Sequence, residues 1–246
     1  MRWRPILAAA LMLFTGGASA QSPSVLQPPL SPPATISAET PVVPIGQQRL
    51  TDTDLNAWLD GYMPYALHSG DLAGAVVYVV RDGRIVAGRG YGYADIARRI
   101  PVDPERTLFR PGSVSKLVTW TAVMQQVEAG RIDLDADIGR YLDFPLPGRA
   151  DGPITMRHLM THTAGFEEAI KDLIGDDPAA VPPFDAYLKR WVPRRIFKAG
   201  TTPAYSNWGT ALAAYIVQRV SGIPFDDYVE QRIFAPIGMN TASFRQ

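Results

Sequence analysis

FRPGSVSKL, residues 109–117, is the stretch that decides how this 246-residue chain is interpreted. Pro111 and Gly112 are unfavourable inside a helix, and apolar residues recur at helical spacing immediately after them. We therefore expect a helix that begins at or next to Ser113. Because residues three apart share a helix face, the Lys116 amine can reach the Ser113 hydroxyl and activate it as a nucleophile.

A second cluster, PAYSNWG at residues 203–209, strengthens the first, which alone is weak because surface helices produce Ser-x-x-Lys by accident. Tyr205 and Asn207 lie two residues apart, just ahead of another apolar helix expected over 208–220 and closed by Gly222. Each of the two patterns occurs only once in the chain. The simpler alternatives are that Asn207 caps this helix and that Tyr205 is an ordinary packed aromatic.

The composition excludes several classes of function. The chain is 46% hydrophobic and 20% charged, which is typical of a globular protein. Its 24 basic and 24 acidic residues leave no net field that favours nucleic acid or an anionic membrane. Cysteine is absent, which excludes disulfides, thiolate nucleophiles and Cys-ligated metals.

The N-terminus has the layout of a secretory signal peptide. Arg2 and Arg4 precede a short apolar run over 6–14, and small residues lead to Ala20, after which we expect cleavage. The run is far shorter than the roughly 20 residues of a transmembrane helix. We therefore expect residues 1–20 to be removed and the mature protein to be periplasmic or secreted.

Residues 21–47 are rich in Pro, Ser, Thr and Ala and carry no charge before Glu39. Such a segment cannot bury enough apolar surface to offset its ordering entropy, so we interpret it as a flexible linker.

Beyond the linker, the pattern predicts a helix over 51–68 and then a β-hairpin. The first strand, 73–80, is continuously apolar, which indicates a strand covered on both faces. A turn at 81–84 leads to the second strand, 85–93, whose glycines we attribute to close packing rather than to a nucleotide loop. After Tyr93 the pattern becomes helical, so the fold class is α+β.

Two histidines four residues apart, His158 and His162, resemble the zinc pair of a metalloprotease helix. The position where that motif needs Glu holds Leu159, so we expect structural, hydrogen-bonded histidines and no metal. Thr155 is the expected N-cap of their helix and Gly165 its terminator. The following segment, 166–183, is interpreted as a surface excursion that either borders a cleft or is merely solvated.

A basic cluster follows at 189–198. We interpret it as ordinary charged surface, with contact to an anionic substrate or cell-wall polymer as the alternative. Its members are Lys189, Arg190, Arg194, Arg195 and Lys198.

With these motifs, the chain resembles the serine beta-lactamase and penicillin-recognising hydrolases, in particular the class C-like branch with its D,D-peptidases and esterases. The resemblance covers roughly Leu50 to Arg245. It rests on residues 109–116, 155–165, 205–207 and 234–239.

The resemblance implies that 48–246 is the N-terminal part of a beta-lactamase/transpeptidase-like fold, a helical subdomain plus an antiparallel sheet. It also implies an acyl-serine mechanism without a cofactor, on a beta-lactam, a D-amino-acid peptide or an ester. Ser113 attacks a carbonyl, Lys116 and Tyr205 relay its proton, and Asn207 orients Lys116 and binds substrate. The chain has no Gly-x-Ser-x-Gly sequence, so a nucleophile-elbow hydrolase is not supported.

The chain departs from the family at its end. Family members continue with a third motif, Lys-Thr-Gly or His-x-Gly, on an inner strand, and this sequence stops at Gln246 before it. We therefore expect a truncated chain with an incomplete sheet, whose edge favours association. Two functions stay open: an exported serine hydrolase, and a catalytically impaired fragment that acts as a cell-wall- or acyl-binding module.

Overall fold

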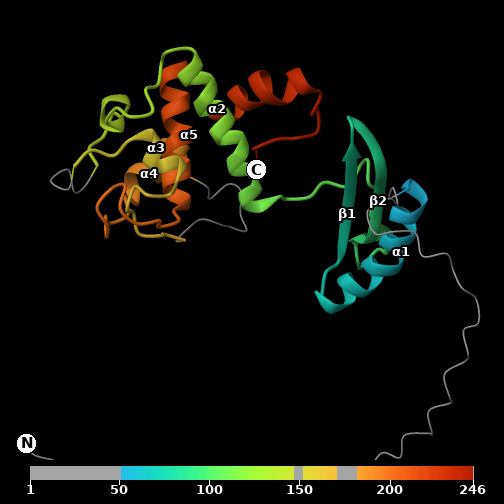
Figure 1. Cartoon of the computed structure of the whole chain (residues 1–246). Coiled ribbons are helices and arrows are strands. Elements are labelled where there is room, and N and C mark those ends of the chain that lie inside the picture. Colours follow the sequence, from blue (N-terminus) through green and yellow to red (C-terminus); the bar gives the residue numbers. More distant parts are fainter. Residues whose placement is uncertain (1–50, 147–151, 171–181, 246) are drawn as a thin grey trace, which may run out of the picture. The chain divides into compact units, whose positions relative to one another are not determined.

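The computed structural model describes residues 51–146, 152–170 and 182–245 (Figure 1). These residues belong to two compact units, an N-terminal unit that ends at Glu105 and a C-terminal unit that begins at Arg106. The expected signal peptide and linker lie outside the described residues. Within the described ranges, none of the helices combines the length and the apolar character needed to cross a membrane.

The N-terminal unit is one helix followed by a small antiparallel sheet. Helix α1 (Asp52–Ser69) begins at Thr51, which forms a capping box with Asp54. Strands β1 (Gly74–Arg81) and β2 (Arg84–Asp95) form a hairpin, and the short β3 (Ile100–Pro101) pairs with the other edge of β2. The helix and the hairpin are confirmed to within about two residues.

The prediction that the first strand is covered on both faces is wrong for the described residues. Tyr78 is 45% exposed and Val80 is 61% exposed. Helix α1 packs against β2, and β1 is an edge strand in the sheet order β1-β2-β3. The apolar run is therefore not matched by a second covering layer in this part of the chain.

The residues directly after Tyr93 are not helical, which corrects a second prediction, although the chain from Gly112 onwards is largely helical. Strand β2 continues to Asp95, turns back and returns as β3. The glycines of β2 allow this close return, since a Cβ on Gly90 would lie 2.3 Å from the carbonyl oxygen of Val102. The prediction that these glycines serve close packing is confirmed.

The C-terminal unit is helical and is built around α5 (Asn207–Ser221), in which nine of 15 residues are buried. Helix α2 (Lys116–Glu128) lies beside α5, as Figure 1 shows. The shorter helices α3 (Met156–Met160), α4 (Phe184–Arg190) and α6 (Phe225–Val229) also contact α5. A π-turn, η5 (Glu230–Phe234), and 3₁₀ turns η2 (Ile138–Tyr141) and η6 (Ala235–Ile237) complete the elements that matter here.

Several helix ends follow the sequence and one does not. Thr155 caps α3 through a capping box with His158, and Gly222 closes α5 in a left-handed conformation, as predicted. Gly165 does not terminate α3, which already ends at Met160. Gly165 instead has a φ of +82° where a Cβ would lie 2.1 Å from the carbonyl oxygen of Phe197, so it serves a close approach between two loops.

Candidate active site

Ser113 lies in a 3₁₀ turn, η1 (Gly112–Ser115), and the α-helix proper begins at Lys116. The predicted helix start is therefore correct for helical structure but three residues early for α2. Gly112 enters the turn with a φ of +56°, a conformation that a side chain disfavours. As a result, Ser113 is exposed at the tip of the helix while Lys116 is half-buried below it.

The structure brings the four predicted site residues together. Lys116 Nζ donates to Ser113 Oγ at 3.0 Å and to Asn207 Oδ1 at 2.6 Å. The hydroxyl of Tyr205 donates to Ser113 Oγ at 2.7 Å. Lys116 Nζ also lies 4.8 Å from the centre of the Tyr205 ring. One serine oxygen thus accepts hydrogen bonds from an amine and a phenol that are far apart in sequence.

Ser206 explains why Tyr205 and Asn207 reach the same place. It is extended, with φ −142° and ψ 115°, so its neighbours project to one side and its own side chain to the other. Ser206 is buried, and its Oγ accepts the N–H of Gly209. Ser206 is therefore the N-cap of α5, and the alternative that Asn207 is the cap is wrong.

His162 holds the segment before α5 in place. Its carbonyl oxygen accepts the N–H of Ala204 at 2.7 Å, and its Nδ1 accepts the N–H of Ser206 at 3.3 Å. Its ring lies 4.4 Å from the ring of Tyr205. Burial, together with the nearby Lys116 charge, lowers the pKa of His162, which favours the neutral imidazole that accepts this bond.

Both histidines are hydrogen-bonded, as predicted, because His158 Nδ1 accepts the N–H of Thr155. Among the described residues, no cluster of His, Asp or Glu side chains has the geometry of a metal site. The sequence interpretation assigned His162 a structural role but did not place it against Tyr205. Its position between Thr161 and Thr163 carries no local signal of that contact.

Glu168 is a site residue that the sequence interpretation missed. Its carboxylate accepts the backbone N–H of Asn207 at 2.9 Å and the Asn207 side-chain amide at 3.3 Å. The prediction that 166–183 is a surface excursion is wrong at Phe166, which is fully buried, whereas the position of Glu168 agrees with the alternative that the segment borders a cleft. Residues 171–181 of that segment lie outside the described part.

Electrostatics favour proton transfer at this cluster. The pKa of the Tyr205 phenol is held below its ordinary value of 10.0, because Lys116 and the Ser113 hydroxyl can both donate hydrogen bonds to the ionised phenol and so stabilise the phenolate. Tyr205 is 46% exposed, so a substrate carbonyl can reach the group from solvent. The arrangement places the Ser113 hydroxyl beside the Lys116 amine and beside a phenol whose pKa is lowered.

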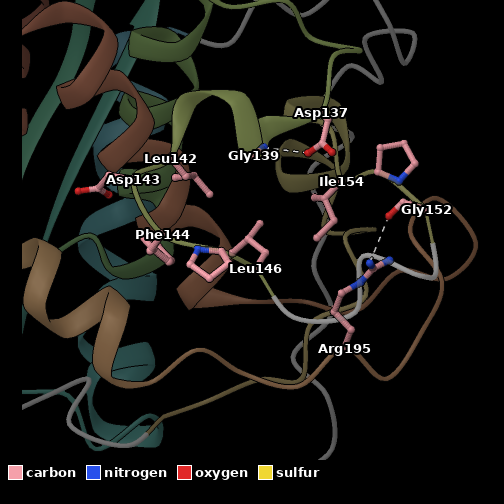
Figure 2. A pocket seen from close by; sticks show the side chains of 11 residues that line it. Asp137, Gly139, Leu142, Asp143, Phe144, Leu146, Gly152, Ile154 and Arg195 are labelled. Carbon is pink, nitrogen blue, oxygen red and sulfur yellow. Dashed lines mark hydrogen bonds between the residues drawn. The ribbon is translucent and has the colours of Figure 1, made fainter.

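A separate cavity of about 510 Å³ lies elsewhere in the C-terminal unit (Figure 2). It is lined from η2 and the residues after it, and Arg195 reaches across it to donate to the carbonyl oxygen of Gly152 at 3.3 Å. None of the four predicted site residues lines this cavity.

The basic cluster at 189–198 is only partly the charged surface that the sequence predicted. The exception is Arg195, which is half-buried. Lys189 forms an ion pair with Asp143 at 3.0 Å.

Comparison with known proteins agrees with the fold and with the motifs. A family model described as Beta-lactamase matches residues 55–246. The putative penicillin-binding protein PbpX of Bacillus subtilis (strain 168) is 30% identical over 198 residues, which cover 80% of this chain and 47% of that protein. Esterase EstB of Burkholderia gladioli is 34% identical over 209 residues, 79% of this chain and 53% of that protein. The chain thus spans about half the length of these relatives.

Solved structures agree. An octameric penicillin-binding protein homologue from Pyrococcus abyssi superposes with a TM-score of 0.66 at 26% identity, over 75% of this chain and 43% of that one. A class C beta lactamase superposes with a TM-score of 0.65 at 26% identity, over 78% and 51% of the two chains. The α+β fold matches part of the beta-lactamase/transpeptidase fold, and the predicted resemblance is confirmed. This chain belongs to the Beta-lactamase family.

Proposed function

We propose that the chain is an exported serine hydrolase that acts through an acyl-serine intermediate. The observation that carries this proposal is the position of Ser113 Oγ, within hydrogen-bond distance of both Lys116 Nζ and the Tyr205 hydroxyl. A serine becomes a nucleophile when a neighbouring group takes its proton, and the ionised Tyr205 phenol is able to do so.

In the proposed mechanism, Tyr205 is the proton acceptor and Lys116 supports it. The lowered pKa of Tyr205 favours the phenolate, which takes the Ser113 proton as Oγ bonds to the acyl carbon. Tyr205 then returns the proton to the leaving group, and water hydrolyses the acyl-serine ester in a second step. The backbone N–H of Ser113, at the start of η1, is the proposed donor to the developing oxyanion. Asn207 orients Lys116 and binds substrate.

The proposed substrates are acyl donors of three kinds: a beta-lactam, a D-amino-acid peptide or an ester. Relatives are named penicillin-binding protein, esterase and, for one protein of Gluconobacter oxydans that is 31% identical, D-aminopeptidase. A peptidoglycan-like substrate agrees with the proposed periplasmic or secreted location. Secreted material is expected to begin at Gln21, which mass spectrometry of the N-terminal peptide tests.

The proposal is tested by covalent labelling of the purified chain with a fluorescent penicillin and with a fluorophosphonate. Peptide mapping is expected to place the adduct on Ser113. Ser113→Ala is expected to abolish labelling, whereas the matched control Ser115→Ala, in the same turn, keeps it. Equal labelling of Ser113→Ala, or an adduct on Ser115 or Ser206, contradicts the proposal.

Turnover distinguishes the hydrolase from its alternative. Chromogenic ester and cephalosporin substrates report on multiple turnover, and the labels report on acylation alone. A persistent adduct on Ser113 without turnover favours the impaired, acyl-binding module.

We also propose that the exposed edge of β1 favours association between copies of the chain. In the described sheet, β1 pairs on one side only and carries the exposed apolar residue Val80. Unpaired strand edges of this kind are templates for pairing with another chain. Light scattering at increasing protein concentration tests this proposal.

A further inference from the structure

Glu168 makes two hydrogen bonds with Asn207 that the proposed mechanism does not yet use. Its Oε2 accepts the backbone N–H of Asn207 at 2.9 Å, and its Oε1 accepts the side-chain amide at 3.3 Å. Asn207 is the first residue of the 15-residue α5, so this N–H is one of the donors without a partner inside the helix. A carboxylate at that end also interacts favourably with the helix dipole.

The neighbours of the Asn207 side chain determine which way its amide points. Oδ1 accepts from Lys116 Nζ at 2.6 Å, and Nδ2 donates to Glu168. An ammonium only donates and a carboxylate only accepts, so the reverse orientation would place donor against donor and acceptor against acceptor. Lys116 and Glu168 together therefore allow one amide orientation.

We propose that Glu168 is a positioning residue for the acyl-serine reaction. It anchors Asn207 so that Oδ1 holds the Lys116 amine beside Ser113 Oγ. This inference rests on the proposed function, because it assigns Glu168 to the same reaction. Glu168 acts through Asn207, with which it makes its two described hydrogen bonds.

Glu168 can be replaced without opening the core, because its side chain is exposed. The neighbouring Glu167 is exposed as well, and its backbone N–H donates to the carbonyl oxygen of Arg194. Glu167→Ala and Glu167→Gln are therefore matched controls that remove a carboxylate from the same loop.

The Glu168 charge gives the role a second, measurable signature. The groups that face Tyr205 are Lys116, Ser113 and His162, and the Glu168 charge acts against Lys116 by raising the pKa of Tyr205. Glu168→Gln removes this charge, so the pKa of Tyr205 falls. Because the phenolate is then present at lower pH, the acid limb of the labelling rate moves to lower pH. If the Glu168 charge has no effect on Tyr205, that limb stays where it is.

The experiment measures the rate of penicillin labelling of Ser113, at saturating and at low probe, for the wild-type chain and each variant. Glu168→Ala is expected to lower the saturating rate by about tenfold to a hundredfold, as for a small misplacement of a catalytic group, with little change in half-saturation. Glu168→Gln is expected to lose less and to show the shifted acid limb. The Glu167 variants are expected to match the wild type, and melting temperatures check that all variants are folded.

A double-mutant cycle tests whether Glu168 acts through Asn207. If it does, Glu168→Ala added to Asn207→Ala causes no further loss, whereas independent effects multiply. Multiplying losses, or a Glu168→Ala variant that labels like the wild type, overturns the positioning role and leaves the proposed function intact. A wild-type chain that is labelled at Ser113 by neither the penicillin nor the fluorophosphonate overturns the proposed function itself, and with it the reaction that Glu168 would serve.

Discussion

Both units of this chain contain many apolar residues, but their interiors differ strongly. In the C-terminal unit, the buried residues form one cluster around α5, with Trp208, Leu212 and Ile216 almost fully enclosed. In the N-terminal unit, one helix lies on a three-stranded sheet, and apolar side chains such as Val80 and Ile85 are more than half exposed. The described hydrogen bonds of the candidate site all join residues of the C-terminal unit.

It follows from this difference that the candidate site depends on the core of the C-terminal unit. Asn207 begins α5, and Ser113 lies in the 3₁₀ turn that leads into α2; both of these helices bury residues in that core. We therefore expect changes in the C-terminal unit to alter reactivity, and changes in the N-terminal unit to alter stability or association instead.

The largest expected effect separates the units by reactivity. Lys116→Met removes the amine at Ser113 and is expected to slow labelling by about 10²–10⁴-fold, the usual range for acid–base groups. Arg89→Met is the matched change in the N-terminal unit, where Arg89 donates to Asn56 at 3.0 Å. It is expected to leave the labelling rate unchanged. Comparable losses in both variants would contradict the separation.

A pair of identical core substitutions compares the two interiors directly. Leu212→Ala and Leu59→Ala each remove a buried leucine, at 0% and 4% exposure, and such changes cost about 2–5 kcal/mol. We expect Leu212→Ala to lie at the upper end, because the surrounding cluster cannot collapse. Leu59 faces a single sheet layer that can relax, so its cost lies at the lower end. Urea unfolding measures both free-energy costs. A larger cost for Leu59→Ala than for Leu212→Ala would contradict the expected difference between the two interiors.

Acidification is expected to weaken the C-terminal unit selectively. Burial lowers the pKa values of His158 and His162 from 6.5, so the unfolded chain binds protons that the folded unit resists. Stability is therefore fully present above the unfolded pKa and declines as the pH falls through 6.5 towards the folded values. Thermal unfolding against pH measures this slope. His162→Gln, which keeps an acceptor for the Ser206 N–H, is expected to flatten it, and the exposed His68→Gln is the control.

The smallest expected effect on stability concerns the strand edge. Val80→Lys places a charge on β1 and is expected to reduce association, while the free energy of unfolding changes by no more than about 0.5 kcal/mol. Leu72→Lys is the control, since Leu72 is 57% exposed but lies outside the strands. If light scattering shows the same association for both variants, the proposal that the β1 edge favours association is contradicted.

Local signals made much of the fold predictable. The cap at Thr155, the turn between β1 and β2, and the left-handed Gly222 each depend on neighbours within a few residues. The exposure of β1 was not predictable, because an apolar run shows that a strand can be covered and not what covers it. The 3₁₀ turn at Ser113 also escaped, since periodicity does not distinguish its tighter winding from an α-helix.

The site was predictable in two halves. Ser113 with Lys116, and Tyr205 with Asn207, are short-range pairs, and only the family resemblance indicated that the two pairs meet. Glu168 was missed because no local pattern links it to Asn207, 39 residues away. The geometry now groups all five residues, whereas their catalytic roles stay predictions until labelling is measured.

The pairing of His162 with residues 204–206 has a consequence for how the family can diverge. Ala204 and Ser206 both donate backbone hydrogen bonds to His162, one to its carbonyl and one to its ring. Any residue can supply the carbonyl, but few side chains can supply the second acceptor. Inherited replacements of His162 should therefore be accompanied by changes around Tyr205, so that residue 162 and residues 204–206 change together in evolution. Replacing only one of these two segments by that of a relative should disturb the position of Tyr205 beside Ser113.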